Sequence, residues 1–141
     1  MTGQHDALSE QECWKLLATA SAGRLALSVR ALPVIVPVRY HLDGRRLAVC
    51  LGHHGLPERA LDETIIAFAA DSIDPATGSG WLVQGQGRSV IPRWLRIDTD
   101  CGAPAAAQVV EIELTRISGQ RMHPCPFIDT LLAAGRPPQA T

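Results

Sequence analysis

Lysine is nearly absent from this sequence. Lys15 is the only lysine among 13 basic side chains, and the others are arginines. Against them stand 14 acidic side chains, which leaves a net charge of -1. A chain without a basic surplus lacks the electrostatic character of a nucleic-acid-binding protein. We therefore expect no nucleic-acid partner, and any anion that the protein binds must meet arginine, histidine or backbone N–H groups.

Long apolar runs and paired cysteines are also missing. No run approaches the roughly 20 apolar residues that a helix needs to cross a bilayer, so we expect no membrane partner. The segment Met1–Ser9 is polar and lacks the apolar stretch of a secretion signal. Cys13, Cys50, Cys101 and Cys125 are scattered and form no CxxC pair, a pattern typical of free thiols in a reducing compartment. These features predict a cytoplasmic protein.

Familiar catalytic motifs do not occur. There is no G-x-S-x-G nucleophile motif. Gly85-Gln86-Gly87 lacks the third glycine and the helix of a dinucleotide-binding loop, and glycines inside a strand pattern predict a bend or a close backbone approach. Cys50, His53 and His54 share one loop, but adjacent histidines do not easily converge on one ion. We predict no metal site.

What is present is one helix followed by strands. A chain of 141 residues with 46% hydrophobic side chains predicts a single domain over residues 1–141 with a substantial core. Ser9 and Glu12 have the spacing of a capping box, which predicts a helix start. The apolar residues after Glu12 recur with a helical period, and Gly23 marks the expected helix end.

Beyond that helix the apolar period changes to two. We expect six strands, over residues 23–30, 33–42, 46–51, 64–70, 81–90 and 109–119. Pro37 cannot donate a ladder hydrogen bond, so it predicts an edge position, a bulge or a barrel rim. Asp43-Gly44 is typical of a two-residue hairpin turn. The pattern predicts a mainly β protein built as a small antiparallel barrel.

Several segments, taken in order, resemble the pyridoxamine 5′-phosphate oxidase-like flavin-binding split-barrel proteins. The resemblance rests on Leu8-Ser9-x-x-Glu12 with Leu16-Leu17, Gly23-Arg24-Leu25, Pro33-x-x-x-Pro37-Val38-x-Tyr40, Asp43-Gly44, Ala67-Phe68, Asp71-x-Ile73-Asp74-Pro75-x-Thr77-x-x-Gly80-Trp81, Gly85-x-Gly87-Arg88 and Arg116–Arg121. It implies a six-stranded antiparallel split β-barrel of the FMN-binding type, with its core at residues 8–122 and a C-terminal tail at 123–141. It also implies a homodimer with flavin sites at the interface.

The resemblance further implies where FMN would lie. The isoalloxazine ring would rest against the second strand, Ile35–Tyr40, which includes Val36, Pro37, Val38 and Arg39. The phosphate would be held by the third strand and the following loop, 50–56, and the partner subunit would contribute residues near Trp81. The implied activity is hydride transfer from flavin to a small acceptor, with the protein supplying orientation and electrostatics.

The expected phosphate anchor is altered in this chain. Related proteins read Arg-Thr-Gly-x-x-Ser-Lys there, whereas this chain reads Cys50, Leu51, Gly52, His53, His54, Gly55 and Leu56. Charge-assisted hydrogen bonds to phosphate contribute about 1.5–3 kcal/mol each, so we expect weaker phosphate binding. Arg39, Arg59 and the two histidines are candidates to replace the lost donors in part.

Two alternatives remain open at this point. The first is another cofactor, either the deazaflavin F420 or haem, with His53 or His54 as the candidate haem ligand. The second is a degenerate barrel that serves only as a binding or dimerisation module. The sequence assigns no catalytic acid or base.

Overall fold

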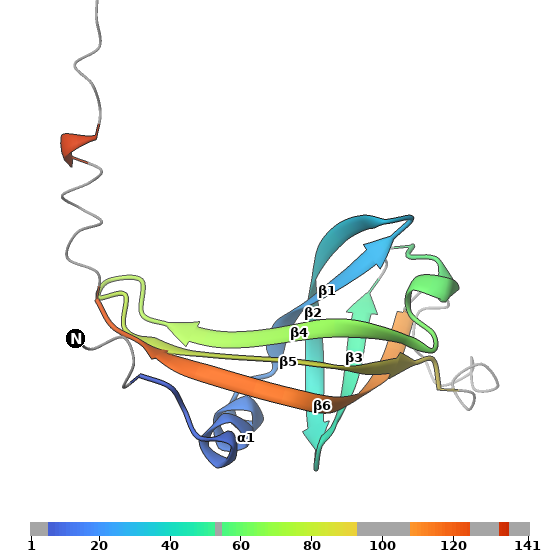
Figure 1. The fold of residues 1–141 in the computed structure, drawn as a ribbon, viewed down its shortest axis with the longest axis horizontal. Helices are drawn as coiled ribbons and strands as arrows, with labels where there is room; N and C mark the ends of the chain where they lie inside the picture. The colour runs from blue at the N-terminus through green and yellow to red at the C-terminus, as the bar shows by residue number, and fades with distance from the viewer. Residues whose placement is uncertain (1–5, 53–54, 93–107, 125–132, 136–141) are drawn as a thin grey trace, which may run out of the picture.

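The computed structural model describes residues 6–52, 55–92, 108–124 and 133–135. Its six strands form one closed antiparallel barrel in the order β1-β2-β3-β6-β5-β4. The strands are β1 Ala22–Val29, β2 Leu32–Asp43, β3 Arg46–Gly52, β4 Thr64–Ile73, β5 Gly80–Val90 and β6 Gln108–Met122. The predicted mainly β, six-stranded antiparallel barrel is therefore confirmed (Figure 1).

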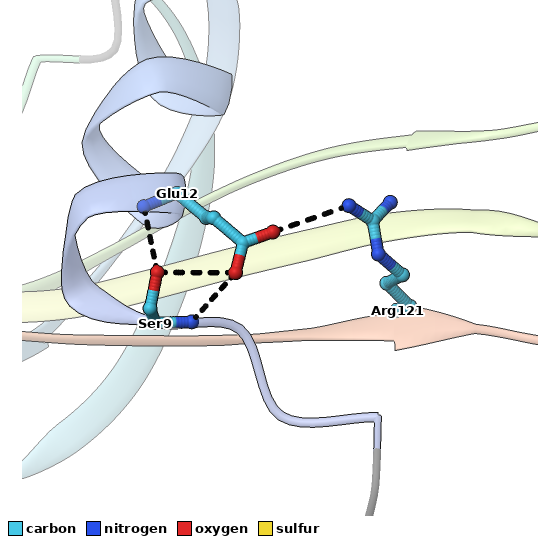
Figure 2. Close-up of polar contacts among 3 residues, drawn as sticks. All are labelled: Ser9, Glu12 and Arg121. Atoms are coloured by element: carbon cyan, nitrogen blue, oxygen red, sulfur yellow. Dashed lines mark hydrogen bonds and ion pairs between the residues drawn. The ribbon is translucent and has the colours of Figure 1, made fainter.

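Helix α1, Glu10–Thr19, precedes the strands and lies against the barrel wall (Figure 1). The predicted capping box is present: Ser9 Oγ accepts from the Glu12 N–H at 3.1 Å, and Glu12 Oε1 accepts from the Ser9 N–H at 3.3 Å. Figure 2 shows that the same carboxylate also meets Arg121 of β6, at 3.3 Å. These contacts fix the start of α1 against the barrel.

The helix end was predicted wrongly. It lies at Thr19 with Ala20 as the C-cap, and Gly23 belongs to β1. A Cβ at Gly23 would lie 2.6 Å from the Ala69 carbonyl oxygen and 2.7 Å from the Phe68 ring. This glycine is therefore needed for close strand packing rather than for helix termination.

The interior of the barrel is filled by alternate residues from all six strands and by one face of α1. The largest fully buried side chains include Phe68, Leu17, Leu25, Leu47 and Ile112. Gly85 and Gly87 provide the predicted close backbone approach, since a Cβ there would collide with a β6 carbonyl oxygen, that of Arg116 or that of Glu113. No described helix is long and apolar enough to cross a bilayer.

Candidate functional site

Strand β2 is paired along its whole length on one side but only partly on the other. Its register with β1 runs from Val29↔Leu32 to Ala22↔Arg39. Its register with β3 covers only Arg39↔Cys50 to Asp43↔Arg46. No described strand pairs with the β3-facing side of residues 32–38, so within the described part of the chain β2 has an open edge there. Figure 1 shows this part of β2 leaving the barrel within the β1–β2 hairpin.

The direction of the backbone groups along this edge follows from one hydrogen bond. The Tyr40 N–H donates to the Ser21 carbonyl oxygen at 2.9 Å, on the β1 side. Backbone groups alternate sides along an antiparallel strand, so the even-numbered residues of β2 face β1. The odd-numbered residues Pro33, Ile35 and Pro37 therefore face the open edge. Of the three settings that the sequence allowed for Pro37, an edge, a bulge or a barrel rim, the described residues show an edge.

The side chains of the predicted ring-binding strand divide between the two faces of the barrel. Val36 and Val38 are each only 5% exposed and fill the core, and their backbone groups face β1 rather than the open edge. Pro37 and Arg39 are exposed on the outer surface. Among the described residues, the Arg39 guanidinium has no ion-pair partner and is available to an anion.

The predicted phosphate-binding segment begins directly opposite Arg39. Cys50 faces outward across from Arg39, and its thiol is free and exposed. Leu51 is 2% exposed and packs in the core. Gly52 then adopts φ +70°, a left-handed conformation that suits glycine, at a register shift between β3 and β6. His53 and His54 lie outside the described residues.

The loop after β3 is tied to β6 by a residue that sequence reasoning missed. The Gln108 amide accepts from the Leu56 N–H at 3.1 Å and donates to the Leu56 carbonyl oxygen at 2.7 Å. Arg59 follows on the short 3-10 helix η1, Glu58–Ala60, where it is exposed. A paired side-chain amide of this kind is not visible in the sequence, because it depends on a neighbour 52 positions away.

Trp81 is not brought to the open edge within the same chain. It lies near the start of β5, between Ser72 of β4 and Arg121 of β6. Figure 1 shows that β5 starts at the end of the long β4–β5–β6 sheet away from η1. The chain therefore brings together Pro37, Arg39 and Cys50, whereas Arg59 and Trp81 stand on separate elements.

An apolar groove of about 180 Å³ on the outer wall was not predicted. Ile35 of β2 lines one part of the groove. The floor of the groove is made of small residues on neighbouring strands: Ala26, Ala67, Ala69 and Gly85. Phe68, the amides of Gln84 and Gln86, and Arg24, which pairs with Asp71 at 2.7 Å, complete the lining. Only the cross-strand register brings these residues together.

Beneath this surface, Tyr40 fixes β2 to the helix. Its hydroxyl donates to the Leu17 carbonyl oxygen at 2.6 Å, and its ring packs edge-on against Phe68 with centroids 4.9 Å apart. Burial raises the pKa of the Tyr40 hydroxyl to about 12. Tyr40 therefore remains a neutral donor at physiological pH and supports the strand from the inside.

No group of three or more potential metal ligands occurs among the residues that the structure describes. The described part of the candidate site consists instead of an open strand edge, one free guanidinium and one exposed thiol. Such a set can pair with a polar ring edge and attract an anion.

Comparison with known proteins shows which family has this architecture. The family model described as pyridoxamine 5′-phosphate oxidase matches residues 9–121, whereas a comparison with curated proteins gives no match. The FAD binding protein from Mycobacterium smegmatis is 23% identical, with a TM-score of 0.64 over 84% of this chain and 98% of its own.

Two further solved structures share the fold. A FAD-binding protein from Mesorhizobium loti is 23% identical, with a TM-score of 0.61 over 82% of this chain and 95% of its own. The FAD and heme binding protein from Mycobacterium smegmatis is 20% identical, with a TM-score of 0.61 over 92% of this chain and 80% of its own. At these identities the similarity shows a common fold.

Proposed function

Because the chain belongs to the pyridoxamine 5′-phosphate oxidase family, we propose that it is a flavin-binding oxidoreductase with FMN as its cofactor. The observation that carries this proposal is the open edge of β2, which leaves backbone groups unpaired beside exposed Arg39. A bound flavin supplies hydride transfer between a donor and a small acceptor. The residues of the chain hold and orient the ring.

The described residues fit the ring better than the phosphate. Val36 and Val38 would support the strand from the core, and Pro37 would contribute an exposed apolar surface and its carbonyl oxygen to the open edge. Arg39 is the described cation in direct register with the third strand, opposite Cys50. Arg59, His53 and His54 are the further candidates for contacts with phosphate, and Leu51 and Gly52 would shape the strand and its turn.

We also propose that two copies associate through the outer wall that carries the groove. Leu32, Ile35 and Ile65 are 68, 69 and 67% exposed, and Ile35 borders the alanine floor of the groove. Exposed apolar side chains beside a groove are typical of an interaction surface. A second copy would cover this surface and bring its Trp81 toward the flavin, as the family resemblance implies.

The test of the cofactor is reconstitution. Purified protein is incubated separately with FMN, FAD, F420 and haem, freed of unbound ligand by gel filtration, and examined by visible absorption. We expect a retained flavin spectrum with about one flavin per chain. If F420 or haem is retained and neither flavin is, the cofactor of this protein is F420 or haem rather than a flavin. If none of the four is retained, the proposal fails and the barrel is better described as an interaction module.

The test of activity uses the reconstituted protein. Anaerobic photoreduction of the bound flavin, followed by addition of a quinone or a nitroaromatic acceptor, should return the oxidised spectrum faster than it does for free FMN. Equal rates with bound and free FMN would argue for a binding role without catalysis.

A further inference from the structure

One stretch of β6 lacks a partner on the side that faces away from β5. The Leu114 N–H donates to the carbonyl oxygen of Arg45, in the turn between β2 and β3, at 3.1 Å. Further along β6, the Gly119 carbonyl oxygen accepts from the N–H of Leu8, in the segment before α1, at 2.9 Å. No described strand pairs with this side of residues 115–118. We call this stretch the β6 gap.

Both ends of the β6 gap are closed by the chain itself. Figure 1 shows α1 and the turn between β2 and β3 on the same side of β6. Glu10 of α1 and Arg45 of that turn form an ion pair at 3.6 Å, so the two elements approach each other. The bonds of Glu12 with Ser9 and Arg121 hold the segment before α1 in place (Figure 2). A long strand therefore cannot run through the gap, whereas a short peptide can enter it.

A cavity of about 390 Å³ lies at the β6 gap. It is lined by all four residues of the gap, by Glu10, and by the exposed side chains of Gln84 and Gln86 on β5. This volume lies in the range of small-molecule sites. The stretch of β6 that has no partner is thus also the stretch that lines a cavity.

A β-bulge shapes this part of β6. Gln86 of β5 pairs with Arg116, whereas the next residue, Gly87, pairs with Leu114. Thr115 is therefore an extra residue, and its hydroxyl donates to the Gln86 carbonyl oxygen at 3.3 Å. Bulges occur preferentially beside functional sites, where they redirect a side chain. Here Arg116 is exposed at the cavity, and no described residue forms an ion pair with it.

The backbone of Ile117 faces the gap. On that side the Arg121 N–H donates to the Asp6 carbonyl oxygen at 2.8 Å, and the Gly119 carbonyl oxygen is bonded there as well. Backbone groups alternate sides along an antiparallel strand, so the N–H and C=O of Ile117 point the same way. Neither group has a partner among the described residues. Together they can pair with one residue of a peptide, as in recognition by strand addition.

The charges around the cavity have the polarity of a free peptide. Strand β3 and the segment before α1 both run antiparallel to β6, so a peptide that fills the gap takes the same direction. Its amino end then lies beside the start of α1, where Glu10 provides a carboxylate. Its carboxyl end lies toward the bulge, where Arg116 provides a guanidinium.

We propose that the β6 gap is a binding site for a free peptide of two or three residues. The α-ammonium group of the peptide meets the Glu10 carboxylate, one amide unit pairs with the Ile117 backbone, and the α-carboxylate accepts from the Arg116 guanidinium. A strand rises about 3.4 Å per residue, so the gap, less its bulged residue, has room for about three residues. This site is separate from the proposed flavin site and does not depend on it.

The first experiment needs no mutation. Trialanine, trialanine amide, N-acetyltrialanine and a six-residue peptide of alternating alanine and serine are titrated into the full chain, and binding is followed by calorimetry. We expect saturable binding of trialanine, and at least about tenfold weaker binding of the other three, which lack one charged end or exceed the gap. No binding of trialanine, or equal binding of any of the other three, overturns the proposal.

Amide hydrogen exchange tests the backbone contact. The Ile117 N–H faces the gap, whereas the Ser118 N–H faces β5 and provides the internal control. We expect saturating trialanine to slow exchange at Ile117 by at least about tenfold and to leave Ser118 nearly unchanged. Unchanged exchange at Ile117 while trialanine is bound overturns the proposed pairing.

Two variants test the charged contacts. We expect Glu10→Gln and Arg116→Gln each to weaken trialanine binding by about fivefold. Glu10→Gln should not change the binding of N-acetyltrialanine, and Arg116→Gln should not change that of trialanine amide, because each peptide already lacks the group concerned. Arg88→Gln, on β5 outside the cavity, is the matched control and should bind trialanine as the wild type does. Equal losses for the free and the blocked peptides overturn the assigned contacts.

Discussion

At the scale of single residues, the site is defined by what β3 places opposite Arg39. Cys50 occupies the position where the family resemblance leads us to expect arginine, and a thiol has no positive charge with which to neutralise a phosphate dianion. Arg39 remains as the cation opposite Cys50, but it is exposed to solvent, so salt screens its charge. The weakness of the phosphate anchor is therefore a property of a few side chains and can be reversed.

Restoring two cations tests this point. In the double variant Cys50→Arg/Leu56→Lys, we expect FMN binding to tighten by about tenfold, the effect of two charge-assisted contacts reduced by exposure. Riboflavin binding should not change. Ala48→Arg adds a cation on the same outer face of β3, opposite His41 rather than Arg39, and should have little effect. Unchanged FMN affinity in the double variant would show that the phosphate lies elsewhere.

Tyr40, the only tyrosine in the chain, gives the site a measurable pH limit. Its pKa is about 12 in the folded protein and about 10 when unfolded, so between these values the folded state retains a proton that the unfolded state has lost. Stability is therefore complete below pH 10 and decreases as the pH rises toward 12. Urea unfolding at pH 8 and pH 11 should show this loss in the wild type.

The matched variant is Tyr40→Phe, which keeps the ring against Phe68 and removes the bond to the Leu17 carbonyl oxygen. We expect it to lower the free energy of unfolding by about 1–2 kcal/mol at pH 8, because a buried acceptor loses its donor. Its further loss between pH 8 and pH 11 should be smaller than that of the wild type. An equal loss would show that another group causes the pH dependence.

At the scale of elements, the β1–β2 hairpin combines a strained turn with a protected edge. Arg30 and Ala31 form its two-residue turn with φ values of 52° and 66°, a conformation that favours asparagine and glycine. The same hairpin carries Pro33 and Pro37 on its open edge. Its shape is therefore maintained against local backbone preference.

Relieving the turn strain should stabilise the protein. We expect Arg30→Asn/Ala31→Gly to raise the free energy of unfolding by about 1 kcal/mol. Asparagine and glycine adopt the left-handed backbone conformation at a lower energy than arginine and alanine do, and this gain exceeds the extra chain entropy that glycine loses on folding. Ala48→Gly, in the extended part of β3, should instead lower it. A destabilised turn variant in the same urea titration would contradict this account of the hairpin.

The sequence predicted the strands well because alternating apolar residues reflect the two faces of a barrel wall directly. It placed the helix start well because the bonds between Ser9 and Glu12 are local. It misplaced the helix end because the requirement for glycine at position 23 comes from Phe68 and Ala69, which are distant in sequence. Pro37 indicated an edge, but the extent of the open edge and the groove were beyond prediction, since both depend on strand register.

At the scale of the whole molecule, the proposed dimer depends on the alanine floor of the groove. Ala67→Glu would place a carboxylate on that floor, where a second copy could not hydrate it. We expect sedimentation velocity to show the wild type as a dimer and this variant as a monomer. Ala18→Glu, on the exposed side of α1, should remain dimeric. A monomeric wild type would refute the assembly, and flavin binding by that monomer would show that the second copy is dispensable.

The central claim is that a flavin occupies the open edge of β2, and amide hydrogen exchange at Ile35 tests it most directly. In the free protein the Ile35 N–H faces the open edge, while the Val34 N–H faces β1 and provides the internal control. Exchange is measured by NMR with and without saturating FMN. The account predicts that FMN slows exchange at Ile35 by at least about tenfold and leaves Val34 nearly unchanged. Unchanged exchange at Ile35 while FMN is demonstrably bound would contradict it.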